Sequence, residues 1–182
     1  MIDLTQTLVQ KYRHEGRKIG RYNASDLWGI VNGYATPQTW LLGHSVKPQE
    51  AYRMWQGKWK HRQVQELLGE MGYVLEQKQE VDYGDFTLVG MVDAMNSEFL
   101  LEIKTSEQVI PKAKEWHRYQ TKIYCSMFNL SRGYVVQPVV KGQSIILKNI
   151  GMVKKDDEWF KRQLDLLSSF HQELLYESKN KI

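Results

Sequence analysis

The spacing of hydrophobic residues divides the chain into a strand-rich middle and helical segments on either side. Runs rich in Val, Leu, Ile, Phe and Tyr are interrupted by turn residues at positions 84–85, 96–98 and 141–142. Short apolar runs joined in this way are typical of hairpins. The predicted strands cover residues 73–83, 86–95, 99–105, 131–140 and 144–150.

The flanking segments have apolar residues at every third or fourth position, as in an amphipathic helix. The clearest stripe lies near the end of the chain and consists of Phe160, Leu164, Leu167, Phe170 and Leu174. Prolines and N-capping residues mark where the helices begin. The predicted helices are a short one capped by Asn23 or Ser25, one from Thr36-Pro37, one from Pro48 to Gly69 or Gly72, one over 112–129 after Pro111, and one over 156–177.

The order of these elements is helices, three strands, a helix, two strands and a helix. It predicts an α/β (α+β mixed) fold, with a central mixed β-sheet flanked by helices. The chain has 182 residues, of which 42% are hydrophobic, and this suits one domain with a proper core. We expect a single domain over 1–182, with an N-terminal helical part (1–48), a core that carries the candidate catalytic residues (49–150) and a C-terminal helix (151–182).

Composition and charge narrow the class of protein only a little. The net charge of +4 is mild support for an acidic partner such as nucleic acid. The single cysteine, Cys125, excludes an internal disulfide and any multi-cysteine metal site within this chain, and it suits a reducing cytoplasm. The sequence has no secretory signal and no run approaching the ~18 apolar residues of a membrane span. We therefore expect a cytoplasmic protein with no membrane partner.

The candidate chemistry lies on two predicted strands. Asp93 comes at the end of the second strand, while Glu102 and Lys104 project from the same face of the third. The short hairpin between these strands allows Asp93 and Glu102 to lie close together. Two carboxylates suit Mg²⁺ or Mn²⁺, which would polarise a phosphate and lower the pKa of a bound water. A lysine beside them would orient that water, so the set predicts phosphodiester hydrolysis.

A simpler interpretation is an ion pair between Lys104 and a carboxylate on a solvated strand face. The surrounding sequence favours the metal site. Apolar residues flank all three charged residues, a glycine precedes them and a predicted helix follows. Charged groups in such surroundings are costly to bury unless they are paired or bound to a metal ion.

The segment GMVDAMNSEFLLEIKTS, residues 90–106, resembles the catalytic hairpin of the PD-(D/E)XK nuclease superfamily. Two further pairs are similar to its RecB-like exonuclease branch. Gln120 and Tyr124 lie one turn apart on the helix after the hairpin, and Gly57 and His61 lie on the helix before it. The resemblance covers residues 57–124 and implies a restriction-endonuclease-like core. The CRISPR-adaptation nucleases of this branch hold an iron–sulfur cluster with four cysteines. This chain lacks them, so we expect no iron–sulfur cluster.

The resemblance also implies a set of metal ligands. His61, Asp93 and Glu102 would bind the ion, with the backbone carbonyl of Ile103 helping. His61 also shares a stripe with apolar residues of its helix, so a core-facing histidine is the alternative interpretation. Gly57 has an alternative too, as a packing glycine that lets another element approach.

Three further roles follow from the resemblance. Lys104 would act on the nucleophilic water, while Gln120 and Tyr124 would shape the site and contact the DNA backbone or the scissile phosphate. Without the two carboxylates, Gln120 and Tyr124 would be interpreted as ordinary residues of a helix surface and core edge. Cys125, next to Tyr124, is interpreted as a packed thiol.

Basic and aromatic residues gather near the predicted site. Lysine and arginine side chains would meet phosphates, and exposed aromatic rings would stack on unpaired bases. The alternative is a solvated helix face whose aromatic residues, Trp116 and Tyr119 among them, lie in the core. The predicted DNA-binding residues are Lys58, Lys60, Arg62, Trp116, Arg118, Tyr119 and Lys122.

Together these features predict a metal-dependent deoxyribonuclease, and the resemblance points to an exonuclease on linear or single-stranded DNA. The expected setting is repair, recombination or phage replication, in a bacterial, archaeal or phage-encoded protein. One alternative is a structure-specific or restriction-type endonuclease. Another is a non-catalytic DNA-binding or assembly subunit with the same fold. The expected partner is DNA, single-stranded or with duplex ends, and any helicase or recombination partner would be a separate chain.

Overall fold

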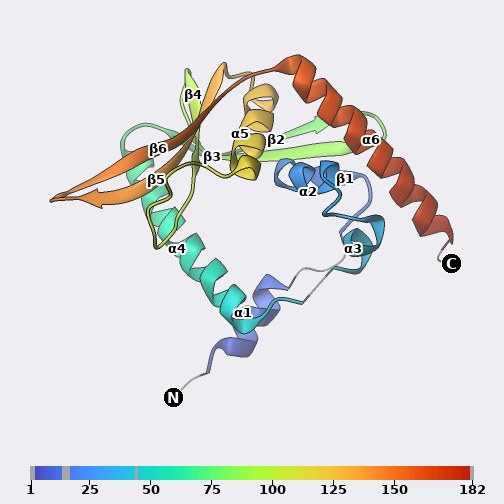
Figure 1. Ribbon diagram of the computed structural model, residues 1–182, viewed down its shortest axis with the longest axis horizontal. Coiled ribbons are helices and arrows are strands. Elements are labelled where there is room, and N and C mark those ends of the chain that lie inside the picture. Colours follow the sequence, from blue (N-terminus) through green and yellow to red (C-terminus); the bar gives the residue numbers. More distant parts are fainter. Residues whose placement is uncertain (1–2, 14–16, 44, 181–182) are drawn as a thin grey trace.

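A mixed β-sheet forms the centre of the molecule (Figure 1). The computed structural model describes residues 3–13, 17–43 and 45–180, and within these ranges the sheet has six strands. Their order is β1-β3-β4-β5-β6, and β2 pairs along the whole of β3. The β1–β3 and β4–β5 pairs are parallel and the others are antiparallel. The strands are β1 Arg21–Asn23, β2 Val74–Asp82, β3 Thr87–Met95, β4 Phe99–Ile103, β5 Arg132–Lys141 and β6 Ser144–Lys154.

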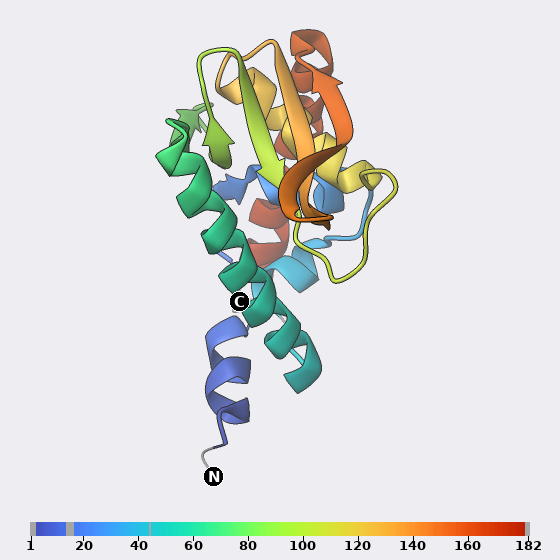
Figure 2. The ribbon, with the colours of Figure 1, turned by 90° about the vertical axis from the view of Figure 1, so that its left-hand side faces the viewer.

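Helices cover both faces of this sheet (Figure 2). On one face, Leu68 of α4 packs with Ala94, Leu101 and Ile103 of the sheet. On the other face, α5 and α6 enclose the larger core together with α2 and α3. The helices are α1 Thr5–Tyr12, α2 Leu27–Val31, α3 Pro37–Leu42, α4 Pro48–Glu70, α5 Glu115–Met127 and α6 Asp157–Asn180, with a 3-10 turn η1 at Ala24–Asp26.

The predicted fold class is confirmed, because the sheet is mixed and flanked by helices. Thr36 caps α3 through its side chain, and Pro48 opens α4, as the sequence predicted. The stripe of the last helix faces the core, where Leu167, Phe170 and Leu174 are buried. Periodicity and capping therefore located most of the elements correctly.

The structure corrects the sequence-based elements at several places. Strand β4 ends at Ile103, so Lys104 follows the strand instead of lying on it. Strand β1 and helix α1 were not predicted. Strand β6 continues to Lys154 instead of ending at Ile150. Helix α5 begins at Glu115 instead of 112, because the chain before it is tied to the sheet: Ile110 donates its N–H to Gln137 Oε1, and the N–H of Ala113 bonds to a carbonyl of β6.

The side-chain alternation of strand β3 breaks at Asp93. Val92 packs in the core beneath α5, and a Cβ on Gly90 would also meet side chains of α5. Two residues after Val92, however, Ala94 packs on the α4 side. Glu76, whose neighbours on β2 pair with Val92 and Ala94, has a left-handed φ of 47°. Irregularities of this kind re-aim side chains in a sheet, and this one lies at the predicted active-site aspartate.

Candidate active site

Asp93 lies where strands β3 and β4 separate. In the described part of the chain, the ladder between them pairs only residues 94–95 with 100–101. One position further on, Asp93 Oδ2 accepts a hydrogen bond of 2.6 Å from the backbone N–H of Ile103. The carboxylate thus takes the backbone donor that a neighbouring strand would otherwise use, and it is fixed at the gap between the strands.

The other Asp93 oxygen faces helix α4. His61 Nε2 lies 3.2 Å from Asp93 Oδ1, but their geometry is not that of a hydrogen bond, and this buried nitrogen has no hydrogen-bond partner among the described residues. Burial disfavours a charged imidazole, yet the carboxylates of Asp93 and Glu102 outweigh it and raise the pKa of His61. Gln65, one turn further along α4, donates to the backbone oxygen of Asp93 at 3.0 Å.

Glu102 is only 3% exposed, although it carries a carboxylate. Lys104 donates to its Oε1 at 2.6 Å, so the two side chains project to the same side of the chain, as their spacing predicted. Its Oε2 has no hydrogen-bond partner among the described residues. Burial, together with the negative charge of Asp93, raises the pKa of Glu102 despite the nearby Lys104.

These residues fit a divalent metal ion by their chemistry. Glu102 Oε2 is a buried acceptor without a donor, His61 Nε2 is buried without a hydrogen-bond partner among the described residues, and both groups interact electrostatically with Asp93. Buried unsatisfied acceptors are unfavourable, and carboxylate and carbonyl oxygens suit Mg²⁺ or Mn²⁺. Nevertheless, no three His, Cys, Asp or Glu side chains within residues 3–13, 17–43 and 45–180 form a ready-made metal cluster. Instead, one oxygen of Glu102 is held by Lys104.

Helix α5 carries Gln120 and Tyr124, which lie near the carboxylates of Asp93 and Glu102. Gln120 Nε2 donates to the Tyr124 hydroxyl at 2.8 Å, as expected for residues one turn apart. The Tyr124 ring is buried next to Gly90 of β3. Burial, with the negative charge of Glu102, raises the pKa of Tyr124 far above neutrality. Its hydroxyl therefore stays protonated and keeps an O–H to donate.

Two residues predicted to bind DNA are engaged with helix α6. The Tyr119 hydroxyl donates to Gln163 at 2.8 Å, and its ring packs against Trp159. Lys122 forms an ion pair of 2.9 Å with Asp156. These contacts favour packing roles for both residues.

Two other predicted DNA-binding residues also contact the protein itself. The ammonium group of Lys58 lies over the ring of Tyr12, 4.9 Å from its centroid. The aliphatic part of Arg118 lies near Gly151 of β6. Arg62 is exposed on α4. The structure thus spreads the seven predicted residues over several sides of the molecule.

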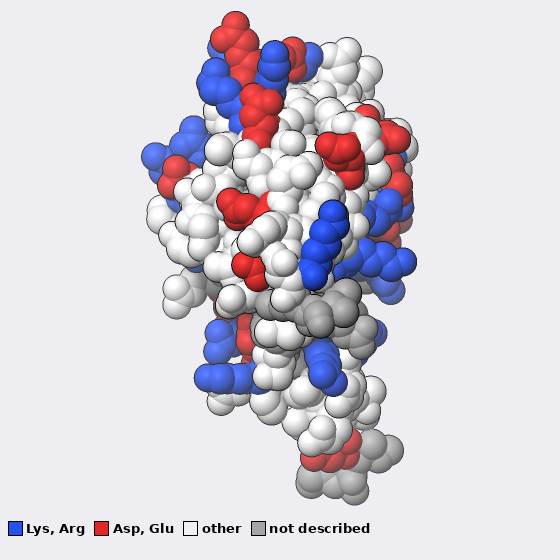
Figure 3. Space-filling model, turned by 90° about the vertical axis from the view of Figure 1, so that its right-hand side faces the viewer, with Lys and Arg blue, Asp and Glu red and all other residues white. Residues whose placement is uncertain are grey.

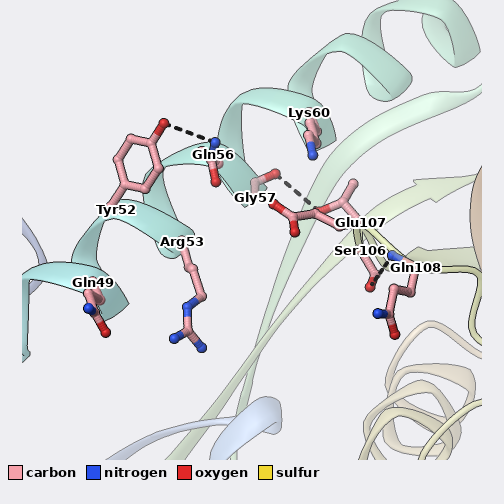
Figure 4. A pocket seen from close by; sticks show the side chains of 10 residues that line it. Gln49, Tyr52, Arg53, Gln56, Gly57, Lys60, Ser106, Glu107 and Gln108 are labelled. Carbon is pink, nitrogen blue, oxygen red and sulfur yellow. Dashed lines mark hydrogen bonds between the residues drawn. The ribbon is translucent and has the colours of Figure 1, made fainter.

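Lys60 lines a polar cavity of about 720 Å³ between α4 and the loop after β4 (Figure 4). The cavity wall includes Thr105, the residue after Lys104, whose hydroxyl donates to the carbonyl of Gly57 at 3.3 Å. Arg53 reaches into the same space from α4 (Figure 4). The cavity therefore adjoins the lysine of the site and carries two basic side chains.

The sequence patterns did not indicate that Arg53, Gln65 and Thr105 lie at or beside the site. Gln65 follows His61 by four residues, so helical spacing alone would have placed it on the same face. Arg53 lies two turns before His61 and is likewise on α4. Thr105 has no such signal, because its contact with Gly57 arises only when the end of β4 meets α4.

The face that includes helix α6 does not have a uniform charge (Figure 3). Lysine and arginine side chains are interspersed there with aspartate and glutamate, and uncharged surface lies between them. A nucleic-acid surface is expected to be basic over a continuous area, so this face is a poor candidate. In the described ranges, no helix has both the length and the apolar character needed to cross a bilayer.

No protein-family model matches the chain, and no curated protein matches its sequence. Solved structures do match its fold. An alkaline exonuclease from Laribacter hongkongensis, LHK-Exo, matches with a TM-score of 0.59 and 14% identity over 97% of this chain and 95% of that one. The same enzyme in complex with dAMP gives 0.61 and 15% over 89% and 91%. A phage-related exonuclease from Haemophilus somnus 129PT gives 0.51 and 13% over 94% and 99%.

These matches confirm the fold that the resemblance implied. The exonucleases belong to the PD-(D/E)XK nuclease superfamily, and the chain shares their mixed sheet with helices on both faces. At identities of 13–15% the likeness shows the fold alone.

Proposed function

We propose that the protein is a divalent-metal-dependent DNA nuclease with His61, Asp93, Glu102 and Lys104 at its centre. The observation that carries this proposal is the meeting of the four residues at the gap between β3 and β4, where Glu102 keeps a buried oxygen without a partner and the buried His61 Nε2 lies 3.2 Å from Asp93 Oδ1. The fold adds support, since exonucleases share it.

Each residue of the centre has a distinct task in hydrolysis. His61, Asp93, Glu102 and the carbonyl of Ile103 would hold Mg²⁺ or Mn²⁺. The bound ion would polarise the scissile phosphate and lower the pKa of a water molecule. Lys104 would orient the attacking water and offset the negative charge that builds on the phosphate. The water oxygen bonds to phosphorus, the P–O ester bond breaks, and the leaving oxygen takes a proton.

The substrate is DNA, and the action is that of an exonuclease on linear or single-stranded strands in repair, recombination or phage replication. A complex of LHK-Exo with dAMP, a deoxynucleotide, supports a DNA partner for this fold. Arg53 and Lys60, in the cavity next to Lys104, would contact backbone phosphates on one side of the site. Gln120 and Tyr124 would donate to the phosphate at the centre.

The test is a titration of the protein with Mg²⁺ or Mn²⁺ against end-labelled DNA, single-stranded and duplex. Asp93→Ala should slow cleavage at least roughly hundredfold, as expected when a group that stabilises the transition state is lost. Asp165→Ala is the matched control, because Asp165 is exposed on α6, and it should cut like the wild type.

Manganese binding, measured by calorimetry without DNA, gives a second readout. Asp93→Ala should weaken it and Asp165→Ala should not. A protein that binds DNA but cuts neither substrate with either metal would be the non-catalytic subunit. Full cleavage by Asp93→Ala would refute the assigned centre instead.

A further inference from the structure

A second cavity, of about 580 Å³, lies between the segment that carries α2 and α3 and the first turns of α5. Figure 1 shows α2 close to one end of α5. Gln120 lines this cavity and also bonds to Tyr124, so the cavity adjoins the proposed centre on the α5 side. Apart from Gln120, the residues that line it have no role in the proposed hydrolysis.

Four aromatic side chains line the cavity wall. Trp28, Tyr34, Trp40 and Trp116 all line it. Tyr34 is 75% exposed and Trp116 is 44% exposed, so both rings are available to a ligand. Trp28 is held in place from behind by an edge contact with Tyr119, at 5.3 Å between ring centroids. The cavity therefore combines a fixed ring with two open ones.

Polar groups are also present in this wall. Arg17 lies over the Trp40 ring, 4.7 Å from its centroid, and forms an ion pair with Asp26. Trp40 is 4% exposed, and its Nε1 has no hydrogen-bond partner among the described residues. The Asp26 carboxylate is bound by Arg17 and Asn23, and Gln120 adds an amide to the wall. An amide can donate to and accept from the edge of a planar heterocycle.

Flat aromatic walls with a few polar groups suit a nucleobase, because every base has a π-face for stacking and an edge for hydrogen bonds. The volume lies within the range of small-molecule sites, and one nucleotide would fit. We propose that this cavity, the base pocket, binds one unpaired nucleobase of the DNA strand that is cut at the site. The inference rests on the proposed nuclease function.

The base pocket predicts a preference among DNA substrates. A base inside a duplex is stacked on both faces and paired at its edge, so it cannot enter. A base in a single strand or at an unpaired end can. The protein should therefore bind single strands and unpaired ends better than blunt duplex ends.

The test measures binding without cleavage, in EDTA, by fluorescence anisotropy of labelled single strands. The strands carry either a normal nucleotide or an abasic residue at one terminus, with each terminus examined separately. The wild type should bind the normal strand at least about fivefold more tightly at one terminus, since stacking on aromatic rings supplies that much per base. Tyr34→Ala should remove most of this difference.

Tyr176→Ala is the matched control, because Tyr176 is 70% exposed on α6 and is not among the residues that line the base pocket. It should keep the full difference, and urea unfolding should show that both variants remain folded. Equal binding of normal and abasic strands by the wild type would overturn the base pocket, as would identical behaviour of the two variants.

Three further outcomes distinguish a free nucleotide from a DNA strand as the ligand, and the base pocket from the nuclease function. If dAMP alone binds, and Tyr34→Ala weakens dAMP but not the strand, the pocket takes a free nucleotide and the strand proposal is wrong. Base-dependent binding without cleavage in any metal would refute the nuclease function alone. Cleavage without base-dependent binding would refute the base pocket alone.

Discussion

The two carboxylate oxygens of Glu102 have different surroundings. One oxygen of Glu102 is bound by the Lys104 ammonium, and the other is buried without a partner. An unsatisfied buried acceptor costs about 1–3 kcal/mol, so the arrangement lowers the stability of the fold. A cation at this atom would offset that cost, which supports the proposal that a metal ion binds the carboxylates and that Lys104 positions the water.

Lys104→Ala should separate metal binding from catalysis. Removing a positive charge beside the carboxylates should leave manganese binding as tight as in the wild type or tighter. Cleavage should fall by roughly a hundredfold or more, because the water loses its positioning group. Calorimetry and a cleavage assay measure the two effects, and Lys161→Ala, an exposed lysine on α6, is the control. Loss of metal binding together with cleavage would show that Lys104 only supports the structure.

His117 should make the fold less stable in mild acid. Burial, with the positive charges of Lys104 and Lys114, lowers the pKa of His117 to about 4. The ordinary pKa of a histidine is about 6.5. Between these two pH values, the unfolded chain binds a proton at His117 that the folded chain does not bind. Stability is therefore complete above pH 6.5 and declines as the pH falls from there toward 4.

Urea unfolding at several pH values measures this decline. His117→Gln should show a shallower decline than the wild type, and the other titrating groups cancel in the comparison. Because His117 is partly exposed, solvent reduces the effect. Parallel curves for the two proteins would contradict the assigned pKa.

Helix α5 packs directly on strand β5 because Gly133 of this strand has no side chain. A Cβ at Gly133 would approach Thr121 Cγ2 to 2.7 Å and Cys125 Sγ to 2.9 Å. Both atoms belong to α5, which also presents Gln120 and Tyr124. The distance between this helix and the sheet therefore controls where the two functional side chains lie.

Gly133→Ala should lower the free energy of unfolding by about 1–3 kcal/mol, the usual cost of overpacking a core. Gly29→Ala provides the comparison, since a Cβ there would only meet Ala35 Cβ at 3.9 Å, in a helix where alanine is favourable. Its stability should be unchanged or higher. Urea unfolding of both variants measures this, and equal stabilities would contradict the close approach.

Local periodicity predicted the strands and helices, but it could not predict the contacts between distant segments. Strand β1 has three residues, too few for a periodic pattern. It is held in place because it pairs with β3 and because the buried Tyr22 hydroxyl forms a hydrogen bond with His171. The start of α5 was misplaced because Gln137, far along the chain, holds the preceding loop. The carboxylate spacing indicated the centre. The roles of Gln65 and Arg53 depend on how α4 crosses the sheet.

At the scale of the whole molecule, one sheet brings together α4, the β3–β4 hairpin and α5, which are separated in the sequence. His61 comes from the first, Asp93 and Glu102 from the second, and Tyr124 from the third. Cys125 is buried in the core under α5, as expected for a packed thiol.

The Cys125 thiol should therefore be unreactive in the folded protein. Burial raises the pKa of Cys125 to about 12, so almost no thiolate forms at neutral pH. A disulfide reagent should leave the folded protein unmodified and should titrate one thiol per chain in urea. Rapid reaction of the folded protein would show that α5 does not pack as described.

The proposed nuclease function is tested most directly by a time course of product lengths from end-labelled linear DNA and from circular DNA, in Mg²⁺ and in EDTA. Linear strands should shorten progressively in Mg²⁺, circles should stay intact, and no cleavage should occur in EDTA. Discrete fragments from the circle would show an endonuclease instead. An absence of cleavage from every substrate would contradict the assignment of His61, Asp93, Glu102 and Lys104 as a catalytic centre.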